Sequence, residues 1–180
     1  MRFYTGLGDD GTTDLLGARV TKDDPRVEVL GALDEASSAI GLGRSLAVDE
    51  RVKDDLISAQ RDLYRIMAEL AFTAEIRPPS YELAQERVAW LGAETDALAA
   101  GVDLPAEFIL PGESQAGAAL DVARTVVRRA EREAVSLARG DHGVSAAILG
   151  YLNRLSSLLF IAARVEDFAA GNTPLRAKTG

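Results

Sequence analysis

Five long stretches with apolar residues at helical spacing are the feature that most constrains the fold of this chain. Their predicted boundaries are about residues 25–47, 49–73, 81–100, 114–138 and 144–169. Apolar residues that recur every three or four positions share one face of a helix. In the fourth stretch this stripe consists of Leu120, Ala123, Val127, Ala130, Ala134 and Leu137. Since long amphipathic helices with short connections pack as antiparallel neighbours, the sequence predicts an all-α fold. We expect an antiparallel five-helix bundle over residues 25–170, in a single domain spanning residues 1–180.

The helix ends are predicted from capping residues and helix breakers. Asp24 is a favourable N-cap, and Pro25 suits the first helical position. Prolines at 78 and 79 end the second helical region, and Ser80 is predicted to cap the third helix. An apolar connector, Phe108–Pro111, precedes the fourth helix, and we do not expect it to be left in solvent. The predicted inward positions of the first and third helices are Val27, Leu30, Ala32, Leu33, Ala36, Ile40, Leu42, Leu83, Val88, Leu91, Ala97 and Leu98.

Residues 1–24 form a glycine-rich leader without helical periodicity, and no β pattern in the chain is long enough to predict a sheet. The segment Gly6–Gly11 matches G-x-G-x-x-G literally, but no full strand precedes it and no helix follows immediately, so it is not a Rossmann site. Glycines let backbone N–H groups approach phosphates closely, and Thr12 and Thr13 add hydroxyl donors. Lys22 follows as a point charge within reach. The leader is therefore either a phosphate-binding loop or a flexible terminus.

Composition excludes several function classes. The net charge of −8 argues against a general nucleic-acid binder, which needs a basic surface. The chain has no cysteine, which excludes disulfides and thiolate metal sites. Its one histidine, His142, falls in a predicted connection between helices and is given no role. We see no signal peptide and no apolar run of membrane length, so we expect a cytoplasmic protein without a membrane partner.

Arginines concentrate in the fourth predicted helix, at the edge of its apolar stripe. Arg124, Arg128 and Arg132 lie there with Glu131. One interpretation is a solvated helix face with weak Arg–Glu pairs. The other is an anion cradle, because guanidinium groups match phosphate oxygens. Elsewhere, Asn153 stands inside an apolar helix, where it costs helix propensity and is expected to have a hydrogen-bond partner.

Several motifs, in order and over nearly the whole chain, together resemble one family. They are Tyr4-Thr5-x-x-Gly8-Asp9-x-Gly11-Thr12-Thr13, Lys22-Asp23-Asp24-x-x-Val27-Glu28, Asp34-Glu35, Ser38-Ala39-Ile40-Gly41, Phe108-Ile109-Leu110-Pro111-Gly112, Ala123-Arg124, Arg128-Arg129-Ala130-Glu131-Arg132, Asn153-Arg154-Leu155-Ser156 and Leu159-Phe160. This set resembles the PduO-type ATP:cob(I)alamin adenosyltransferases.

The resemblance implies a homotrimer of five-helix bundles with active sites between subunits. It implies an ATP site made of Thr5, Gly6, Leu7, Gly8, Thr13, Lys22, Arg128, Arg129, Glu131, Arg132 and Asn153. It also implies an inter-subunit ion pair of Asp34 with Arg124, and Phe108 against the lower face of the corrin ring. The chain departs from the family pattern at Gly6 and Leu7, where basic and threonine residues are usual, and at Ser157, where aspartate is usual.

The family reaction moves the 5′-deoxyadenosyl group of ATP onto Co(I) of cobalamin and releases triphosphate, with Mg²⁺ bound. Under the resemblance, Lys22, Asp34, Phe108, Arg124 and Arg128 form the catalytic set, with no protein metal ligands. A reductase and an adenosylcobalamin-dependent client enzyme are expected partners. Two alternatives stay open: an ATP- or cobalamin-binding carrier or sensor on the same scaffold, and a purely structural bundle.

Overall fold

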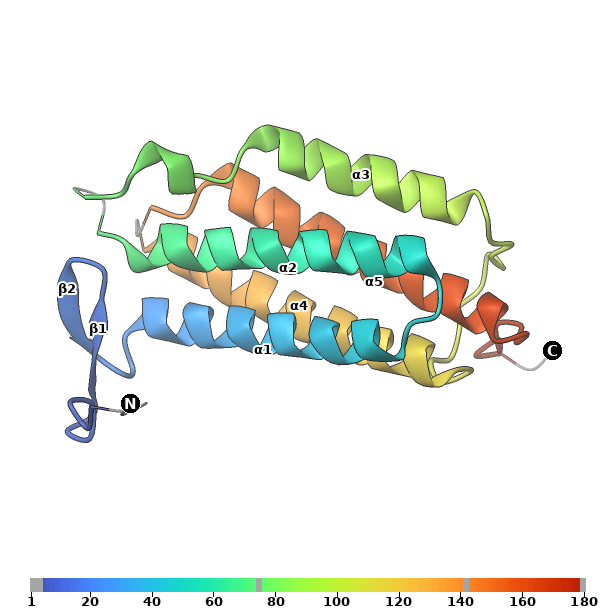
Figure 1. Cartoon of the computed structure of the whole chain (residues 1–180), viewed down its shortest axis with the longest axis horizontal. Helices are drawn as coiled ribbons and strands as arrows, with labels where there is room; N and C mark the ends of the chain where they lie inside the picture. The colour runs from blue at the N-terminus through green and yellow to red at the C-terminus, as the bar shows by residue number, and fades with distance from the viewer. Residues whose placement is uncertain (1–4, 74–75, 141–142, 179–180) are drawn as a thin grey trace.

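A bundle of five long helices makes up the body of the computed structural model, which describes residues 5–73, 76–140 and 143–178 (Figure 1). Tyr4 and His142 lie outside these ranges. The elements are β1 Thr12–Leu15, β2 Ala18–Thr21, α1 Pro25–Leu46, α2 Glu50–Ala71, the 3-10 helix η1 Pro79–Tyr81, α3 Gln85–Ala99, α4 Gln115–Arg139 and α5 Ala146–Ala169. The predicted helical bundle is confirmed, and each helix agrees with its predicted range to within a few residues.

Side-chain caps explain where four of the helices begin. Asp24 accepts a hydrogen bond from the Arg26 N–H at 2.8 Å, with proline in the first turn of α1, as predicted. The N-caps of the other three are Asp49 for α2, Ser114 for α4 and Ser145 for α5. These side chains satisfy backbone N–H groups that have no partner within the first turn of a helix.

The predicted start of α3 is wrong. Ser80 lies inside η1 and caps nothing, and α3 begins four residues later than predicted, at Gln85. The N-cap position of α3 is Ala84, which makes no side-chain cap. The two prolines before Ser80 favour the tight 3-10 turn, because their fixed φ suits the start of a short helix. Proline also has no backbone N–H, so it cannot donate the hydrogen bonds that would extend a helix.

The leader contains a β-hairpin that the sequence analysis did not predict. Strands β1 and β2 pair antiparallel with Thr13 opposite Val20, and Gly17 in the connecting turn has a φ of +102°. An isolated two-stranded hairpin is only marginally stable in water. Here it is held against the end of α2, because the Leu16 N–H donates to the Ala71 carbonyl and the Thr73 N–H donates to the Leu16 carbonyl.

The hydrophobic core follows the predicted helix faces, with two exceptions. All six residues of the predicted α4 stripe are buried, as are Ile148, Leu152, Leu155, Leu159 and Ala162 of α5. Leu42 and Ala97, however, are exposed. Leu42 is two residues from the fully buried Ile40, which puts it roughly 200° around the helix and therefore on the opposite face. Val29, which was not predicted, is buried in α1.

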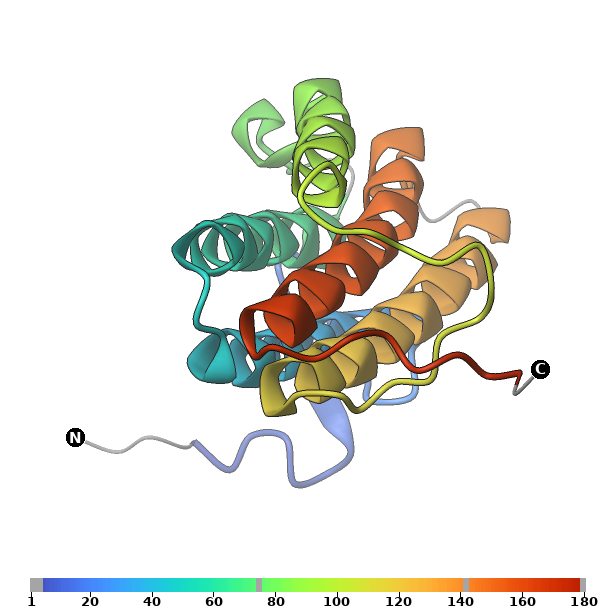
Figure 2. The same cartoon turned by 90° about the vertical axis from the view of Figure 1, so that its right-hand side faces the viewer.

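Helix α5 is the one described helix long and apolar enough, by length and composition alone, to cross a membrane. The expectation that no apolar run reaches that length is therefore wrong. More than half of its most apolar window is buried inside the bundle, against α3 and α4 (Figures 1 and 2). A central core helix has apolar residues around most of its surface because other helices surround it.

The C-terminal half of α5 also carries buried charges, and each has a partner on another element. The Arg164 guanidinium contacts Asp121 of α4 at 2.7 Å and Asp167 at 2.9 Å. Glu166 accepts hydrogen bonds from the backbone N–H groups of Val48 and Asp49, between α1 and α2. These contacts fix the position of α5 relative to two other segments of the bundle, α4 and the α1–α2 connection.

One buried carboxyl group makes stability depend on pH. Asp55 of α2 is 8% exposed, and its Oδ2 atom has no hydrogen-bond partner. Burial, and next the charge of Glu94, raise the pKa of Asp55 to about 6. The folded state thus binds the proton more tightly than the unfolded chain. The stability contributed by protonated Asp55 is therefore present at low pH and is lost as pH rises through about 4 to 6.

We expect Asp55→Asn to be more stable than the wild type at pH 7.5 and equally stable at pH 4. The pKa shift sets an upper bound of about 3 kcal/mol, which solvent screening reduces to about 1 kcal/mol. Urea unfolding at both pH values measures the difference. Asp54→Asn, an exposed neighbour, is the control and should show little pH-dependent difference. A stabilisation of Asp55→Asn that is the same at both pH values would contradict the prediction.

Candidate active site

The arginines of α4 fall into two classes according to their partners. Arg124 donates to Asp121 at 2.8 Å, and Arg129 pairs with Glu133 at 3.3 Å and with Glu35 of α1. Arg128 and Arg132, by contrast, have no carboxylate within 4.0 Å anywhere in the described ranges. Both are exposed, and the Arg132 Nη1 donates to the Arg128 carbonyl at 3.1 Å.

Two like charges four residues apart on one helix face repel each other. Arg128 and Arg132 stand in that relation and line one shallow groove of about 330 Å³, together with Glu131 and Arg139. Arg128 also borders a second groove of about 340 Å³ that includes Arg124, Ser157 and Phe160. A bound polyanion would relieve the repulsion and match the guanidinium groups. This face of α4 is thus suited to bind a polyphosphate.

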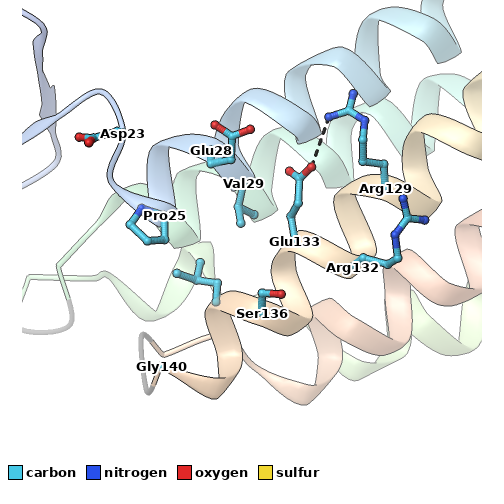
Figure 3. A pocket seen from close by; sticks show the side chains of 10 residues that line it. Asp23, Pro25, Glu28, Val29, Arg129, Arg132, Glu133, Ser136 and Gly140 are labelled. Carbon is cyan, nitrogen blue, oxygen red and sulfur yellow. Dashed lines mark hydrogen bonds and ion pairs between the residues drawn. The ribbon is translucent and has the colours of Figure 1, made fainter.

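A hollow of about 790 Å³ lies between the start of α1 and the second half of α4 (Figure 3). Arg129 and Arg132 are on its wall, and Arg129 is directed toward Glu133, with which it pairs. Glu28 also lines it. With Asp23 and Glu133, three carboxylates line this hollow and disfavour a polyphosphate within it, so Arg132 rather than Arg129 is the available cation there.

The glycine loop of the leader is organised by its own backbone and by two basic side chains. Gly6 and Gly11 have φ values of +73° and +82°, which other residues rarely adopt. A Cβ atom on Gly8 would lie 2.9 Å from the Thr12 carbonyl oxygen, so the close approach requires glycine. The Lys22 Nζ donates to the Gly8 carbonyl at 2.8 Å. Lys22 therefore contacts the backbone of the glycine loop directly.

The remaining predicted leader residues lie in or beside this loop. The Leu7 N–H donates to the Thr5 Oγ1 at 3.3 Å. Thr13 was expected in a loop, but it belongs to β1 and is half-buried. The Leu7 side chain is 64% exposed. The loop thus presents backbone groups and an apolar side chain to solvent.

Arg19 is a residue of this region that the sequence analysis did not identify. Its guanidinium pairs with Asp14 at 2.9 Å and donates to the Leu7 carbonyl, so it connects the hairpin to the glycine loop. In the hairpin register Asp14 lies opposite Arg19, and no sequence pattern indicated this pairing because no hairpin was predicted. Opposite charges directly across two strands stabilise their pairing.

The two halves of the predicted ATP site do not meet within one chain. In the described residues, no hydrogen bond or ion pair joins residues 5–22 to α4, and the hairpin contacts α2 instead. Asp34 is exposed on α1, while Arg124 pairs with Asp121 of its own helix. A single chain thus leaves the leader, Asp34 and the α4 arginines as separate groups.

Two further predicted residues have clear positions. The Asn153 Nδ2 donates to Glu131 Oε1 at 2.9 Å, so the expected partner exists and connects α5 to α4. Phe108 is 87% exposed on the connector between α3 and α4. The expectation that this apolar connector is not left in solvent is therefore wrong for the single chain, although the neighbouring Ile109 is half-buried.

Comparison with known proteins gives consistent matches. A family model described as cobalamin adenosyltransferase matches residues 3–166. A corrinoid adenosyltransferase of Bacillus subtilis is 39% identical over 95% of this chain and 89% of its own length. One from Mycobacterium tuberculosis is 43% identical over 92% and 89%. Corrinoid adenosyltransferase PduO of Salmonella typhimurium is 41% identical over 93% of this chain, which spans only 50% of that protein.

Solved structures agree with the sequence relatives. A variant PduO-type ATP:corrinoid adenosyltransferase from Lactobacillus reuteri, complexed with cobalamin and ATP, has a TM-score of 0.90 and 32% identity, covering 99% of this chain and 100% of that one. Another variant from the same organism, complexed with ATP, has a TM-score of 0.88 and 33% identity, covering 98% and 100%. With a family model matching most of its length and close agreement in fold, this chain belongs to the cobalamin adenosyltransferase family.

Proposed function

We propose that this chain transfers the 5′-deoxyadenosyl group of ATP to cob(I)alamin, forming adenosylcobalamin and releasing triphosphate. The observation that carries the proposal is the pair of exposed α4 arginines, Arg128 and Arg132, which have no carboxylate partner within the described ranges while their neighbours Arg124 and Arg129 are paired. Family membership and the neighbouring structures complexed with cobalamin and ATP support it.

The proposed ATP site joins the glycine loop of one subunit to α4 of a neighbouring subunit in a homotrimer. Its residues are Thr5, Gly6, Leu7, Gly8, Thr13, Lys22, Arg128, Arg129, Glu131, Arg132 and Asn153. Lys22, Arg128 and Arg132 contact the triphosphate. The hydrogen bond from Asn153 to Glu131 aligns α5 with α4. The exposed apolar side chains on α1 and α4, Leu42 and Val122, support burial by another subunit.

In the reaction, Co(I) attacks C5′ of the ribose, a Co–C bond forms, and the C5′–O bond breaks. The bonding electrons leave with the triphosphate, and cobalt is formally oxidised by two electrons. Since cobalt is the nucleophile, the protein needs no activated serine or cysteine. Its contribution is to hold C5′ in line with cobalt, which is worth roughly 7–11 kcal/mol in favourable cases. Lys22, Arg128 and Arg132 stabilise the charge that develops on the leaving group.

Phe108 supplies an apolar surface for the lower face of the corrin ring in this proposal. Its 87% exposure in the single chain leaves the phenyl ring of Phe108 available for contact with the corrin. An apolar group at that face excludes a lower axial ligand, and Co(II) without that ligand is more easily reduced to Co(I). Asp34 and Arg124 are proposed to pair across the subunit boundary, with Arg124 exchanging or sharing its present partner, Asp121.

Mg²⁺ enters the proposal as part of the MgATP substrate. The described residues contain no group of three or more His, Cys, Asp or Glu side chains that could form a metal site. Mg²⁺ commonly binds through substrate phosphates and retained waters rather than in a cage of protein ligands. The triphosphate is therefore its proposed ligand, and no protein residue is assigned to it.

We also place the reaction in the cytoplasm and expect two protein partners. The substrate is Co(I), so a reductase must supply electrons to cobalamin. Its product is used by adenosylcobalamin-dependent enzymes, one of which is the expected client.

One product assay separates the candidate functions. Purified protein is mixed with MgATP and chemically reduced cobalamin, and both adenosylcobalamin and triphosphate are measured. The transferase forms the two products in equal amounts. A carrier or sensor binds ATP or cobalamin but releases no triphosphate. A structural bundle binds neither and gains no thermal stability from ATP, whereas a ligand at a hundred times its Kd adds roughly 2.7 kcal/mol.

A further inference from the structure

The connector that carries Phe108 is paired with the C-terminal segment of the chain. Ile109 and Arg176 form an antiparallel bridge. On either side of it the Leu110 N–H donates to the Leu175 carbonyl and the Ala177 N–H donates to the Phe108 carbonyl, each at 2.8 Å. Figure 2 shows the red C-terminal segment running beside the yellow connector between α3 and α4.

This pairing determines which way Phe108 faces. In an extended strand, successive side chains point to opposite sides. Ile109 is half-buried toward the bundle, so Phe108 and Leu110 on either side of it face outward, and they are 87% and 43% exposed. A shift of one residue in the pairing would turn Phe108 inward and Ile109 outward.

The C-terminal segment is held mainly by these backbone bonds. Leu175, Arg176 and Ala177 are exposed and add little to the hydrophobic core. The ion pair between Arg176 and Glu107 measures 3.1 Å, but its side chains are 61% and 49% exposed, so solvent weakens it. The Asn172 side chain also donates to the Glu113 carbonyl at the other end of the connector.

We propose that residues 172–177 are a positioning segment: by pairing with the connector, they hold Phe108 outward and in place for the corrin ring. The inference rests on the proposed function, because it assigns the segment a role in binding cobalamin. The segment does not touch the reacting atoms. Its loss is therefore expected to affect cobalamin binding and to leave ATP binding unchanged.

Ala177→Pro tests the proposal, because proline has no N–H to donate to the Phe108 carbonyl. Ala177→Gly keeps the N–H and is the matched control, and Arg176→Ala tests the exposed ion pair separately. We expect Ala177→Pro to raise the KM for cobalamin about tenfold while the KM for ATP stays within twofold. Amide hydrogen exchange at Leu110 should accelerate about tenfold, and the melting temperature should not change, since the bundle core is untouched. Both control variants should resemble the wild type.

The outcomes separate this inference from the proposed function. If the wild type forms no adenosylcobalamin, the proposed function fails, and so does the role given to the segment. If the wild type is active and Leu110 exchanges faster in Ala177→Pro without any change in the KM for cobalamin, the positioning role is overturned and the function stands. Unchanged exchange at Leu110 also overturns it, because the pairing would then not hold the connector. An equal rise in the KM values for cobalamin and ATP indicates a general structural effect and also contradicts the positioning role.

Discussion

Arg128→Ala should lower kcat/KM for adenosyl transfer by about 100-fold or more while the helical content stays the same. Removing one preorganised donor to a developing charge typically costs 10²–10³ in rate. Arg128 is exposed and has no ion pair in the described part of the chain, so the bundle loses no internal contact. Steady-state kinetics with reduced cobalamin, together with far-ultraviolet circular dichroism, measure the two effects.

A matched control and a conservative variant sharpen this test. Arg65→Ala removes another exposed arginine, on α2, and should leave kcat/KM within about twofold. Arg128→Lys keeps the charge but loses the planar pair of donors, and should give an intermediate rate. Stabilisation by ATP should also be smaller in Arg128→Ala than in the wild type. A variant that keeps more than a third of the wild-type kcat/KM would remove Arg128 from the proposed triphosphate site.

Arg164→Ala should destabilise the fold by about 3–5 kcal/mol, a large share of the stability of a typical domain. The Arg164 side chain is 1% exposed and contacts both Asp121 and Asp167. Its removal leaves the buried Asp167 carboxylate with one side-chain hydrogen-bond partner in the described ranges, the Ser114 hydroxyl at 2.7 Å. An uncompensated buried charge, rather than a lost attraction, dominates the cost. Urea unfolding at pH 7 measures the change in free energy of unfolding.

A double variant identifies the source of this cost. Arg164→Ala combined with Asp167→Ala removes a positive and a negative charge together, so its loss should be smaller than the sum of the two single losses. Lys53→Ala, which breaks the exposed pair with Glu50, should cost about 0.5 kcal/mol or less. Additive losses in the double variant would show that the Arg164–Asp167 pair does not account for the cost.

Much of the helical body was predictable because it depends on local chemistry. The cap of α1 at Asp24 and the buried stripe of α4 arise from neighbours in sequence, so spacing alone identified them. The family was also recognised from motifs at fixed places along the chain, and the family model agrees. Residue types and their spacing therefore determined the five-helix class and the family.

Only the tertiary structure decided which arginine of α4 is available. Arg128 and Arg129 are adjacent and chemically alike, but Arg129 meets Glu35, a residue of another helix nearly a hundred positions earlier in the chain. The hairpin likewise required the carbonyl of Ala71, far from its strands in sequence. In both cases the deciding partner is distant along the chain, so local residue propensities could not predict it.

Phe108 is an apolar residue whose exposure the sequence also failed to predict. Its apolar character predicted burial, yet the pairing of the connector with Arg176 and its neighbours leaves the Phe108 side chain exposed to solvent. Local sequence determined which segments become helices and which residues are apolar, since those depend on spacing and on side-chain chemistry. Tertiary structure decided which side chains are paired, buried or presented outward, because those outcomes depend on contacts between segments that are far apart in the chain.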